Sequence, residues 1–301
     1  MEAKLKAEKE GSDAVELFME MLDTKLSDAK DILIERFHYI ASQSAASAKF
    51  MYENHSMTGY HEEEGIVSAL KHGTIVIGQL GLTETLQILI GKDQTTNEGM
   101  ELAKCIEALY LKRCNEFKAE YKLNFGVYYT PAESLCYTAF VKWKDKYGDM
   151  ENVTYYLDEN GNRVDKLYFT NSIHIPVYKQ MSPFEKVDIE SQLTGYSNAG
   201  CITYVEVTHD AVHNTEALEE LVNYAMKKDI PYFAINLPAD TCENCGYQGN
   251  IGDVCPKCGS DNISRLRRVT GYLTGNYTTA FNAGKQVETD QRVKHKDITN
   301  F

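Results

Sequence analysis

Four cysteines gather within 17 residues in the C-terminal part of the sequence. They form two pairs, Cys242-Glu-Asn-Cys245 and Cys255-Pro-Lys-Cys258, and a glycine follows each pair at once. A pair of this spacing places two thiolates on one tight turn, and the glycine lets the backbone fold around an ion. Four thiolates complete the tetrahedral shell of a structural zinc site, so we expect zinc on Cys242, Cys245, Cys255 and Cys258. The alternatives are a redox-active pair or knuckles without metal.

The other four cysteines are scattered along the chain, as Cys105, Cys114, Cys136 and Cys201. Buried cysteine behaves as a small hydrophobic residue, and we expect this of all four. Since thiols stay reduced in the cytoplasm, the expected location of this chain, the tight quartet favours a metal site over two disulfides.

A second glycine-containing segment follows the cysteines. It consists of residues 267–273 (RRVTGYL) and, farther on, of residues 281–285 (FNAGK) with Glu288, Arg292 and His295. From the residues alone, Gly271 is a turn glycine at the tip of a loop, because glycine adopts backbone dihedral angles that other residues rarely reach. Arg267 and Arg268 would then be surface charges.

The pattern R-V-x-G-Y, with F-N-x-G-K-x-x-E and R-V-K-H after it, resembles the glycyl radical loop of the anaerobic (class III) ribonucleotide reductases. Residues 73–84, 123–134, 168–174 and 199–207 resemble stretches of the family's catalytic barrel, in the family's order. The family also carries a four-cysteine zinc domain directly before its radical loop. Other glycyl radical enzymes, such as formate acetyltransferase, share R-V-x-G-Y but are not expected to have the four cysteines.

The resemblance implies that Gly271 stores the radical. In the family, an S-adenosylmethionine-dependent iron–sulfur activating enzyme removes one α-hydrogen from the matching glycine. Gly275 lies outside the R-V-x-G-Y pattern and is not a candidate. The resemblance further implies the anaerobic reduction of ribonucleoside triphosphates to deoxyribonucleoside triphosphates for DNA synthesis, with formate as the reductant, by an assembled homodimer.

Family members are longer than these 301 residues and carry the substrate-attacking cysteine and the nucleotide-phosphate contacts upstream. We therefore expect a C-terminal portion that is inactive alone and is completed by an N-terminal half. The alternatives are an inactive fragment, a spare-part protein that lends a glycyl radical to a damaged partner, and a non-enzymatic zinc-knuckle binding protein. Glu133, Asn171, His174 and Glu206 lie in the family-like stretches, but a structural role explains each equally well, and we leave them out of the catalytic residues.

The apolar pattern predicts the elements that position these groups. Helical spacing predicts long helices over residues 13–42 and 98–121, with a turn and a buried helix between residues 72 and 90. From residue 124 onward, short strand-like runs alternate with helical stretches, which favours an α/β layer or barrel. The expected strands are residues 125–129, 172–177, 202–207 and 232–236, the expected helices are residues 131–147, 183–193 and 216–228, and Asn160-Gly161 predicts a hairpin between residues 153–157 and 164–169.

We therefore predict an α/β chain that forms the second half of a ten-stranded glycyl-radical-enzyme barrel, followed by a zinc-knuckle and radical-loop tail. The expected domains are a polar lead-in (residues 1–12), the C-terminal half of the barrel (13–240), the zinc knuckles (241–260) and the radical loop with the C-terminal tail (261–301).

Charge and hydropathy exclude two classes of partner. The 31 basic and 44 acidic side chains give a net charge of −13, which repels nucleic-acid backbones, although residues 265–268 form a local basic cluster. The longest apolar runs fall far short of the roughly 20 residues that span a bilayer. Met1 leads into lysines rather than into an apolar signal segment. We expect neither a nucleic acid nor a membrane as a partner.

Overall fold

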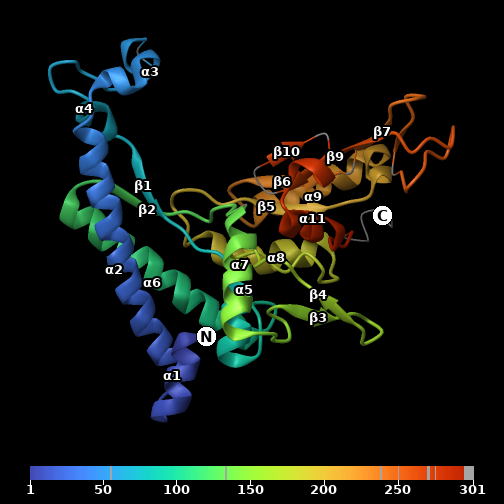
Figure 1. Cartoon of the computed structure of the whole chain (residues 1–301), viewed down its shortest axis with the longest axis horizontal. Helices are drawn as coiled ribbons and strands as arrows, with labels where there is room; N and C mark the ends of the chain where they lie inside the picture. Colours follow the sequence, from blue (N-terminus) through green and yellow to red (C-terminus); the bar gives the residue numbers. More distant parts are fainter. Residues whose placement is uncertain are drawn as a thin grey trace.

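The computed structural model is a mixed α/β structure in which long helices lie at one side and the C-terminal sheet at the other (Figure 1). It describes residues 1–54, 56–132, 134–237, 239–249, 251–269, 272–274 and 276–294. The helices of the described residues are α1 (Glu2–Glu10), α2 (Ala14–Ala41), α3 (Lys49–Glu53), α4 (Val67–Leu70), α5 (Leu82–Ile90), α6 (Asn97–Tyr121), α7 (Ser134–Tyr147), α8 (Pro183–Thr194), α9 (Thr215–Lys227), α10 (Tyr277–Ala280) and α11 (Ala283–Asp290), with short 3-10 helices at Ala45–Ala48 and His209–His213.

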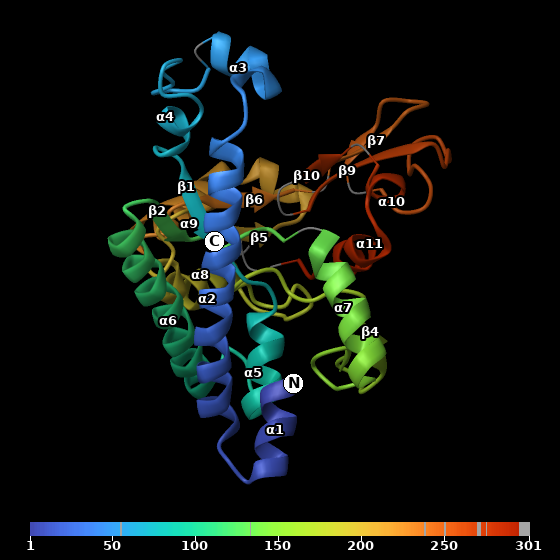
Figure 2. The same ribbon diagram turned by 60° about the vertical axis from the view of Figure 1, so that its left-hand side comes forward.

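The two longest helices, α2 and α6, pack side by side, as both views show (Figures 1 and 2). Asp13 caps α2 by accepting hydrogen bonds from the backbone N–H groups of Val15 and Glu16. Thr96 caps α6 by accepting one from Gly99. These ends confirm the two long helices predicted from helical spacing. The polar lead-in is itself a helix, α1, which packs against α2 and ends at Gly11 with a φ of 70°.

Two pairs of parallel strands form the centre of the fold. In the first pair β1 (Thr74–Ile77) lies beside β2 (Asn124–Val127), and in the second β5 (Thr203–Glu206) lies beside β6 (Phe233–Asn236). Backbone hydrogen bonds of 3.0 Å, from Ala199 N–H to the Val127 oxygen and from Tyr129 N–H to the Gly200 oxygen, connect the first pair to the segment before β5. The described strands form separate small sheets, and a closed ten-stranded barrel is not found among them.

The main apolar core lies between α2, α5, α6 and the first strand pair. Most of its side chains come from elements that the sequence pattern predicts, but β1 occupies residues where we expected a turn, and Ile173 lies in a segment where we expected a strand. The deeply buried members include Leu26, Ile77, Leu82, Leu86, Met100, Ala103, Ile106, Cys114, Phe117, Phe125 and Val127. Burial of this apolar surface is the main stabilising contribution in this part of the chain.

The strand predicted over residues 172–177 is absent. Ser172 has a φ of 41°, which interrupts an extended strand. The backbone groups of the segment bond to side chains instead, since Gln94 Nε2 donates to the carbonyls of Ile173 and His174, and Ile175 N–H donates to Glu190 Oε1. The segment is buried without a sheet partner because side chains distant in sequence satisfy its polar groups.

The predicted hairpin is present as β3 (Tyr155–Leu157) and β4 (Arg163–Asp165), which pair antiparallel. Gly161 lies between them with a φ of 77°, a conformation that favours glycine. The helix predictions for α7, α8 and α9 are also confirmed, with ends shifted by a few residues. Among the described residues, none of the helices combines the length and the apolar character needed to cross a membrane.

The C-terminal part forms a four-stranded antiparallel sheet in the order β10, β9, β7, β8. Its long central strand is β9, which pairs with β7 on one side and β10 on the other. The four strands are β7 (Ala239–Cys242), β8 (Gln248–Gly249), β9 (Ile263–Val269) and β10 (Tyr272–Thr274). Helix α11 contacts both β9 and α7, so the last described helix packs against the rest of the molecule (Figures 1 and 2).

Candidate metal centre and neighbouring cavity

The structure brings the four predicted cysteines together in the turns beside β7 and β9. The Sγ atoms of Cys242, Cys245, Cys255 and Cys258 all lie within 4.8 Å of one another. The Sγ atoms of Cys242 and Cys258 are 3.5 Å apart, and those of Cys245 and Cys255 are 3.6 Å apart. A zinc–sulfur bond of about 2.3 Å implies an edge of about 3.8 Å in a tetrahedron, so the four atoms fit a zinc ion closely.

The two halves of this site are built alike. Gly246 donates its backbone N–H to the oxygen of Cys242, and Gly259 donates to the oxygen of Cys255, both at 2.8 Å. The φ angles of the two glycines are 70° and 73°. Residues with a side chain rarely adopt this conformation, which explains why each Cys-x-x-Cys pair is followed by glycine.

The environment of the site favours a thiolate at Cys255. Burial works to raise the pKa of this thiol, but backbone N–H groups of Lys257 and Cys258 donate to the sulfur and lower the pKa to about 7. Thiolates are the form that binds zinc. The cluster could therefore hold zinc in a closed structural shell, which leaves no position for a substrate.

Arginines of β9 fix the metal centre to the C-terminal sheet. Arg265 and Arg267 both form ion pairs with Asp240, which is fully buried on β7. Asp240 also accepts the backbone N–H of Ile251, and Arg265 donates to the oxygen of that residue at 2.7 Å. The expectation that Arg267 is a surface charge is wrong, because this side chain turns inward to a buried carboxylate. Two of the three arginines in the basic cluster over residues 265–268 thus share one buried carboxylate.

The predicted radical carrier, Gly271, lies outside the described residues. In sequence it falls between β9 and β10, whose backbones pair antiparallel with Val269 opposite Tyr272. The described strands on either side therefore fix the register of this hairpin. Glu133 also lies outside the described residues.

A cavity lies at the end of β5, and Glu288 and Arg292 of the C-terminal segment also line it. Asn171, His174 and Glu206, three of the residues considered above, all line it, together with Lys186, Tyr204, Arg292 and others. Glu206 is the last residue of β5, and its Oε1 accepts a hydrogen bond of 2.8 Å from Asn236 at the end of β6. Polar groups thus converge at the carboxyl ends of two parallel strands, the usual place for a ligand in an α/β sheet.

His174 is held firmly at the wall of this cavity. Its Nδ1 lies 3.3 Å from Glu190 Oε1, and Lys186 Nζ lies 3.3 Å from the same oxygen. Burial works to raise the pKa of Glu190, but the positive charge of Lys186 and the His174 contact lower it to about 2. Glu190 is therefore a buried carboxylate that fixes the orientation of the imidazole ring.

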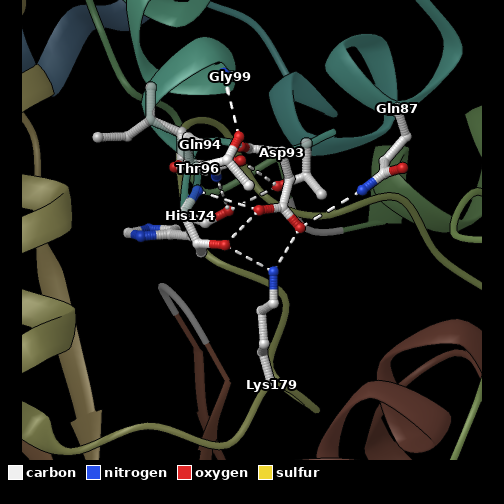
Figure 3. Close-up of polar contacts among 10 residues, drawn as sticks. Gln87, Asp93, Gln94, Thr96, Gly99, His174 and Lys179 are labelled. Carbon is white, nitrogen blue, oxygen red and sulfur yellow. Dashed lines mark hydrogen bonds and ion pairs between the residues drawn. The ribbon is translucent and has the colours of Figure 1, made fainter. Parts of the chain in front are cut away.

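The backbone of His174 is fixed by a second set of contacts, shown in Figure 3. Gln94 Nε2 donates to the His174 oxygen at 2.9 Å, and Lys179 Nζ forms an ion pair of 2.6 Å with Asp93 in the same turn. Burial works to raise the pKa of Asp93, but hydrogen bonds from Lys179 and Thr95 lower it. The wall of the cavity is thus a rigid polar network, which sequence reasoning did not find because its members are distant along the chain.

The remaining cysteines divide differently from the prediction. Cys114, Cys136 and Cys201 are buried, as expected, but Cys105 is exposed. The buried face of α6 includes Ala103, so Cys105, two residues farther along the helix, points away from the core. Cys136 lies near the cavity, with its Sγ 3.1 Å from Oδ1 of Asn171.

Comparison with known proteins supports the sequence resemblance. The family model described as anaerobic ribonucleoside-triphosphate reductase matches residues 3–295. The anaerobic ribonucleoside-triphosphate reductase of Escherichia coli (strain K12) is 32% identical over 305 residues, covering 97% of this chain and 41% of that protein. The corresponding protein of Enterobacteria phage T4 is 30% identical over 290 residues, covering 93% of this chain and 44% of the phage protein.

Solved structures show the same fold. An anaerobic ribonucleotide reductase superimposes with a TM-score of 0.73 at 18% identity, covering 98% of this chain and 44% of that chain. The anaerobic ribonucleotide reductase from Thermotoga maritima in complex with dATP and CTP gives a TM-score of 0.64 and covers 95% of this chain and 43% of that chain. This chain spans about 40% of the length of the curated relatives that it matches. By the extent of these matches, the chain belongs to the family of anaerobic (class III) ribonucleoside-triphosphate reductases.

Proposed function

We propose that this chain is the C-terminal portion of an anaerobic ribonucleoside-triphosphate reductase and that it carries the glycyl radical on Gly271. The family match over residues 3–295 is the observation that carries the proposal. The four-cysteine cluster, which directly precedes the R-V-x-G-Y pattern in the sequence, supports it. We propose that zinc binds to Cys242, Cys245, Cys255 and Cys258. We also propose the domains given above, with boundaries after residues 12, 240 and 260.

In this proposal the two parallel strand pairs belong to a ten-stranded barrel. Within the described residues β1 pairs only with β2, so one edge of β1 is available to a further strand. Val76 on this strand is 37% exposed although it is apolar. An edge of this kind is a ready place for strand pairing, and we assign it to the complementary N-terminal half of the reductase.

The chemistry that we assign to the assembled enzyme follows from the family. An S-adenosylmethionine-dependent activating enzyme takes one α-hydrogen from Gly271, and the resulting radical is passed to a cysteine of the N-terminal half. That cysteine abstracts the 3′-hydrogen of a ribonucleoside triphosphate, and water leaves from C2′, with formate as the reductant. This chain supplies the radical store and one wall of the cavity, while the attacking thiol comes from the other half.

The test is reconstitution. The purified chain is activated anaerobically with the activating enzyme, S-adenosylmethionine and a reductant, and is then given ribonucleoside triphosphate and formate. We expect it to form no deoxyribonucleotide alone and to form it when the complementary N-terminal half is added. Product formation by the chain alone would contradict the split-enzyme proposal. An assembled complex that forms a radical on this chain without turnover would favour an inactive fragment.

The spare-part alternative has its own outcome. A spare part restores turnover to a full-length relative that has been cleaved at its own radical glycine, whereas a split half requires a partner that lacks the C-terminal region. The two mixtures can be assayed side by side with the same substrate. A non-enzymatic zinc protein gives neither radical nor turnover in any mixture.

A further inference from the structure

The C-terminal segment after the hairpin packs tightly onto the rest of the molecule through α11. Asn282 caps this helix by accepting the backbone N–H of Lys285 at 3.0 Å. A Cβ atom on Gly284 would lie 2.5 Å from the oxygen of Leu167 and 2.7 Å from Cβ of Tyr137. Only glycine permits so close an approach. The glycine of the F-N-x-G-K pattern is therefore required for α11 to pack against α7.

A chain of buried charges continues from α11. Lys285 Nζ lies 2.6 Å from Glu288 Oε2, and Glu288 Oε1 lies 3.3 Å from Nη2 of Arg292. Lys285 and Glu288 are only 2% and 3% exposed. Burial works to raise the pKa of Glu288, but Lys285 and Arg292 outweigh it and lower the pKa. Charges so deeply buried are costly unless paired, so each depends on its neighbours.

Arg292 connects this chain of charges to two other elements. Its Nη1 donates to the backbone oxygen of Arg268 at 2.6 Å and lies 3.2 Å from Glu206 Oε1. Arg268 belongs to β9 and Glu206 is the last residue of β5. The guanidinium group of Arg292, which is 8% exposed, thus connects the segment after α11 to β9 and to the end of β5.

The shape of the guanidinium suits this bridge. Arginine presents several N–H donors in a fixed plane, whereas lysine offers a single point of charge on a flexible stem. The bond to the Arg268 oxygen acts on β9 one residue before Val269, which pairs with Tyr272 across the hairpin. A contact at this point restrains both strands beside Gly271.

We propose that Arg292 is a positioning residue that holds the β9–β10 hairpin, which flanks Gly271 in the sequence, against the end of β5. The docking role stands on the contacts of the described residues. Its consequence for the radical rests on the proposed function, because a glycyl radical must be stored at a fixed place and out of contact with solvent. Loss of the bridge should open the hairpin and expose the cavity that Arg292 lines.

The test combines hydrogen exchange with electron paramagnetic resonance on Arg292→Ala and Arg292→Lys. We expect the alanine variant to raise amide exchange in residues 263–269 and 272–274 by about tenfold or more, since these strands would open locally, with no change in β1 and β2. After activation in the presence of the N-terminal half, its radical yield should fall severalfold and the radical should decay faster. The lysine variant keeps the charge and should lie between the alanine variant and the parent.

Arg163→Ala is the matched control, because Arg163 also pairs with two carboxylates, Asp149 and Asp165, but on the exposed β4 hairpin. It should leave both readouts unchanged. Parent-like exchange and radical yield in both Arg292 variants would overturn the inference. If the parent forms no radical while Arg292→Ala still opens the hairpin, the proposed function fails and the docking role stands. Should the alanine variant not fold, the lysine variant decides by the same two readouts.

Discussion

The body of the molecule (residues 14–237) and its tail (residues 239–294) are stabilised in different ways. The body buries large apolar side chains between α2, α5, α6 and the strands, with Leu86 and Phe125 almost fully enclosed. The apolar cluster of the tail consists of Cys242, Ile251 and Cys255, two of which belong to the four-cysteine cluster. A small layer of this kind buries too little apolar surface to fold by itself, so we expect the tail to depend on a bound metal ion and on buried ion pairs.

This difference suits the roles that we propose for the two regions. A body stabilised by apolar packing keeps its fold without a ligand. In our proposal the barrel half needs this property, because it must stay folded before it assembles with the N-terminal half. A tail held by a few specific contacts can be fixed in one position and still be released by changing one of them. The comparison is tested by substitutions that weaken either the apolar packing of the body or the specific contacts of the tail and leave the other unchanged.

The largest effect is expected at the metal centre. We expect the parent to bind about one zinc per chain, and Cys255→Ser to lose nearly all of it, because structural zinc contributes on the order of 10 kcal/mol to the folding of small zinc domains. Hydrogen exchange should rise throughout the tail and stay unchanged in α2 and α6. Metal analysis together with exchange measurements checks this.

The exposed Cys105 on α6 provides the control for that experiment. Cys105→Ser removes a thiol without touching the cluster and should leave both zinc content and exchange at parent values. Zinc binding by Cys255→Ser as tight as that of the parent would refute the assignment of the ligands.

The second effect concerns the apolar core of the body. Leu86→Ala removes a fully buried side chain from α5 and should lower the free energy of unfolding of the body by about 3 kcal/mol. Zinc content should not change, because the tail has its own stabilising contacts. Denaturant unfolding followed by circular dichroism gives the first quantity and metal analysis gives the second.

Leu135 on α7 is 56% exposed and supplies the matched control. Leu135→Ala makes the same chemical change at the surface and should cost far less stability than Leu86→Ala. If Leu86→Ala released zinc, the two regions would not be independent and the comparison would fail.

A smaller, pH-dependent effect is expected at Glu107, which is fully buried on α6 beside Gln79. Burial raises the pKa of this carboxyl from 4.5 to about 7. The unfolded chain therefore releases this proton at lower pH than the folded chain does. As a result, the free energy of unfolding falls as the pH rises from about 4.5 to about 7. A shift of this size corresponds to at most about 3 kcal/mol.

Glu107→Gln keeps the shape of the side chain and removes its titration. We expect the free energy of unfolding of the variant, measured with urea at pH 5 and pH 8, to fall less with pH than that of the parent. Glu101→Gln, an exposed change on the same helix, should behave as the parent does. Equal pH dependence of Glu107→Gln and parent would show that Glu107 is charged in the folded chain at both pH values.

The sequence predicted those elements whose signal is local. Helices α2 and α6 follow from apolar spacing, and the cysteine cluster follows from two short patterns with the same spacing. The segment over residues 172–177 was mistaken for a strand because its partners, Gln94 and Glu190, lie about 80 residues before and about 15 residues after it in the sequence. The expected burial of Cys105 was wrong because two residues, about half a turn of a helix, separate the core face from the surface.

The ionic contacts of the tail also escaped sequence reasoning. The sequence around Arg267 is typical of a surface charge. Only the pairing of β9 with β7 brings Asp240 next to this side chain. Arg292 was noted as part of a pattern, but its partners Glu206 and Arg268 come from two other strands. Contacts between elements depend on the tertiary arrangement, which no local pattern contains.

The central claim, that Gly271 carries the radical, has one direct measurement. The chain and its N-terminal half are incubated without oxygen with the activating enzyme, S-adenosylmethionine and a reductant, and the electron paramagnetic resonance spectrum is recorded. We predict an organic-radical doublet, split by the one remaining α-hydrogen, that is absent in Gly271→Ala and present in Gly275→Ala. Subsequent exposure to air should cleave the parent near residue 271. A doublet that persists in Gly271→Ala, or an assembled and activated parent without any radical, would contradict the account.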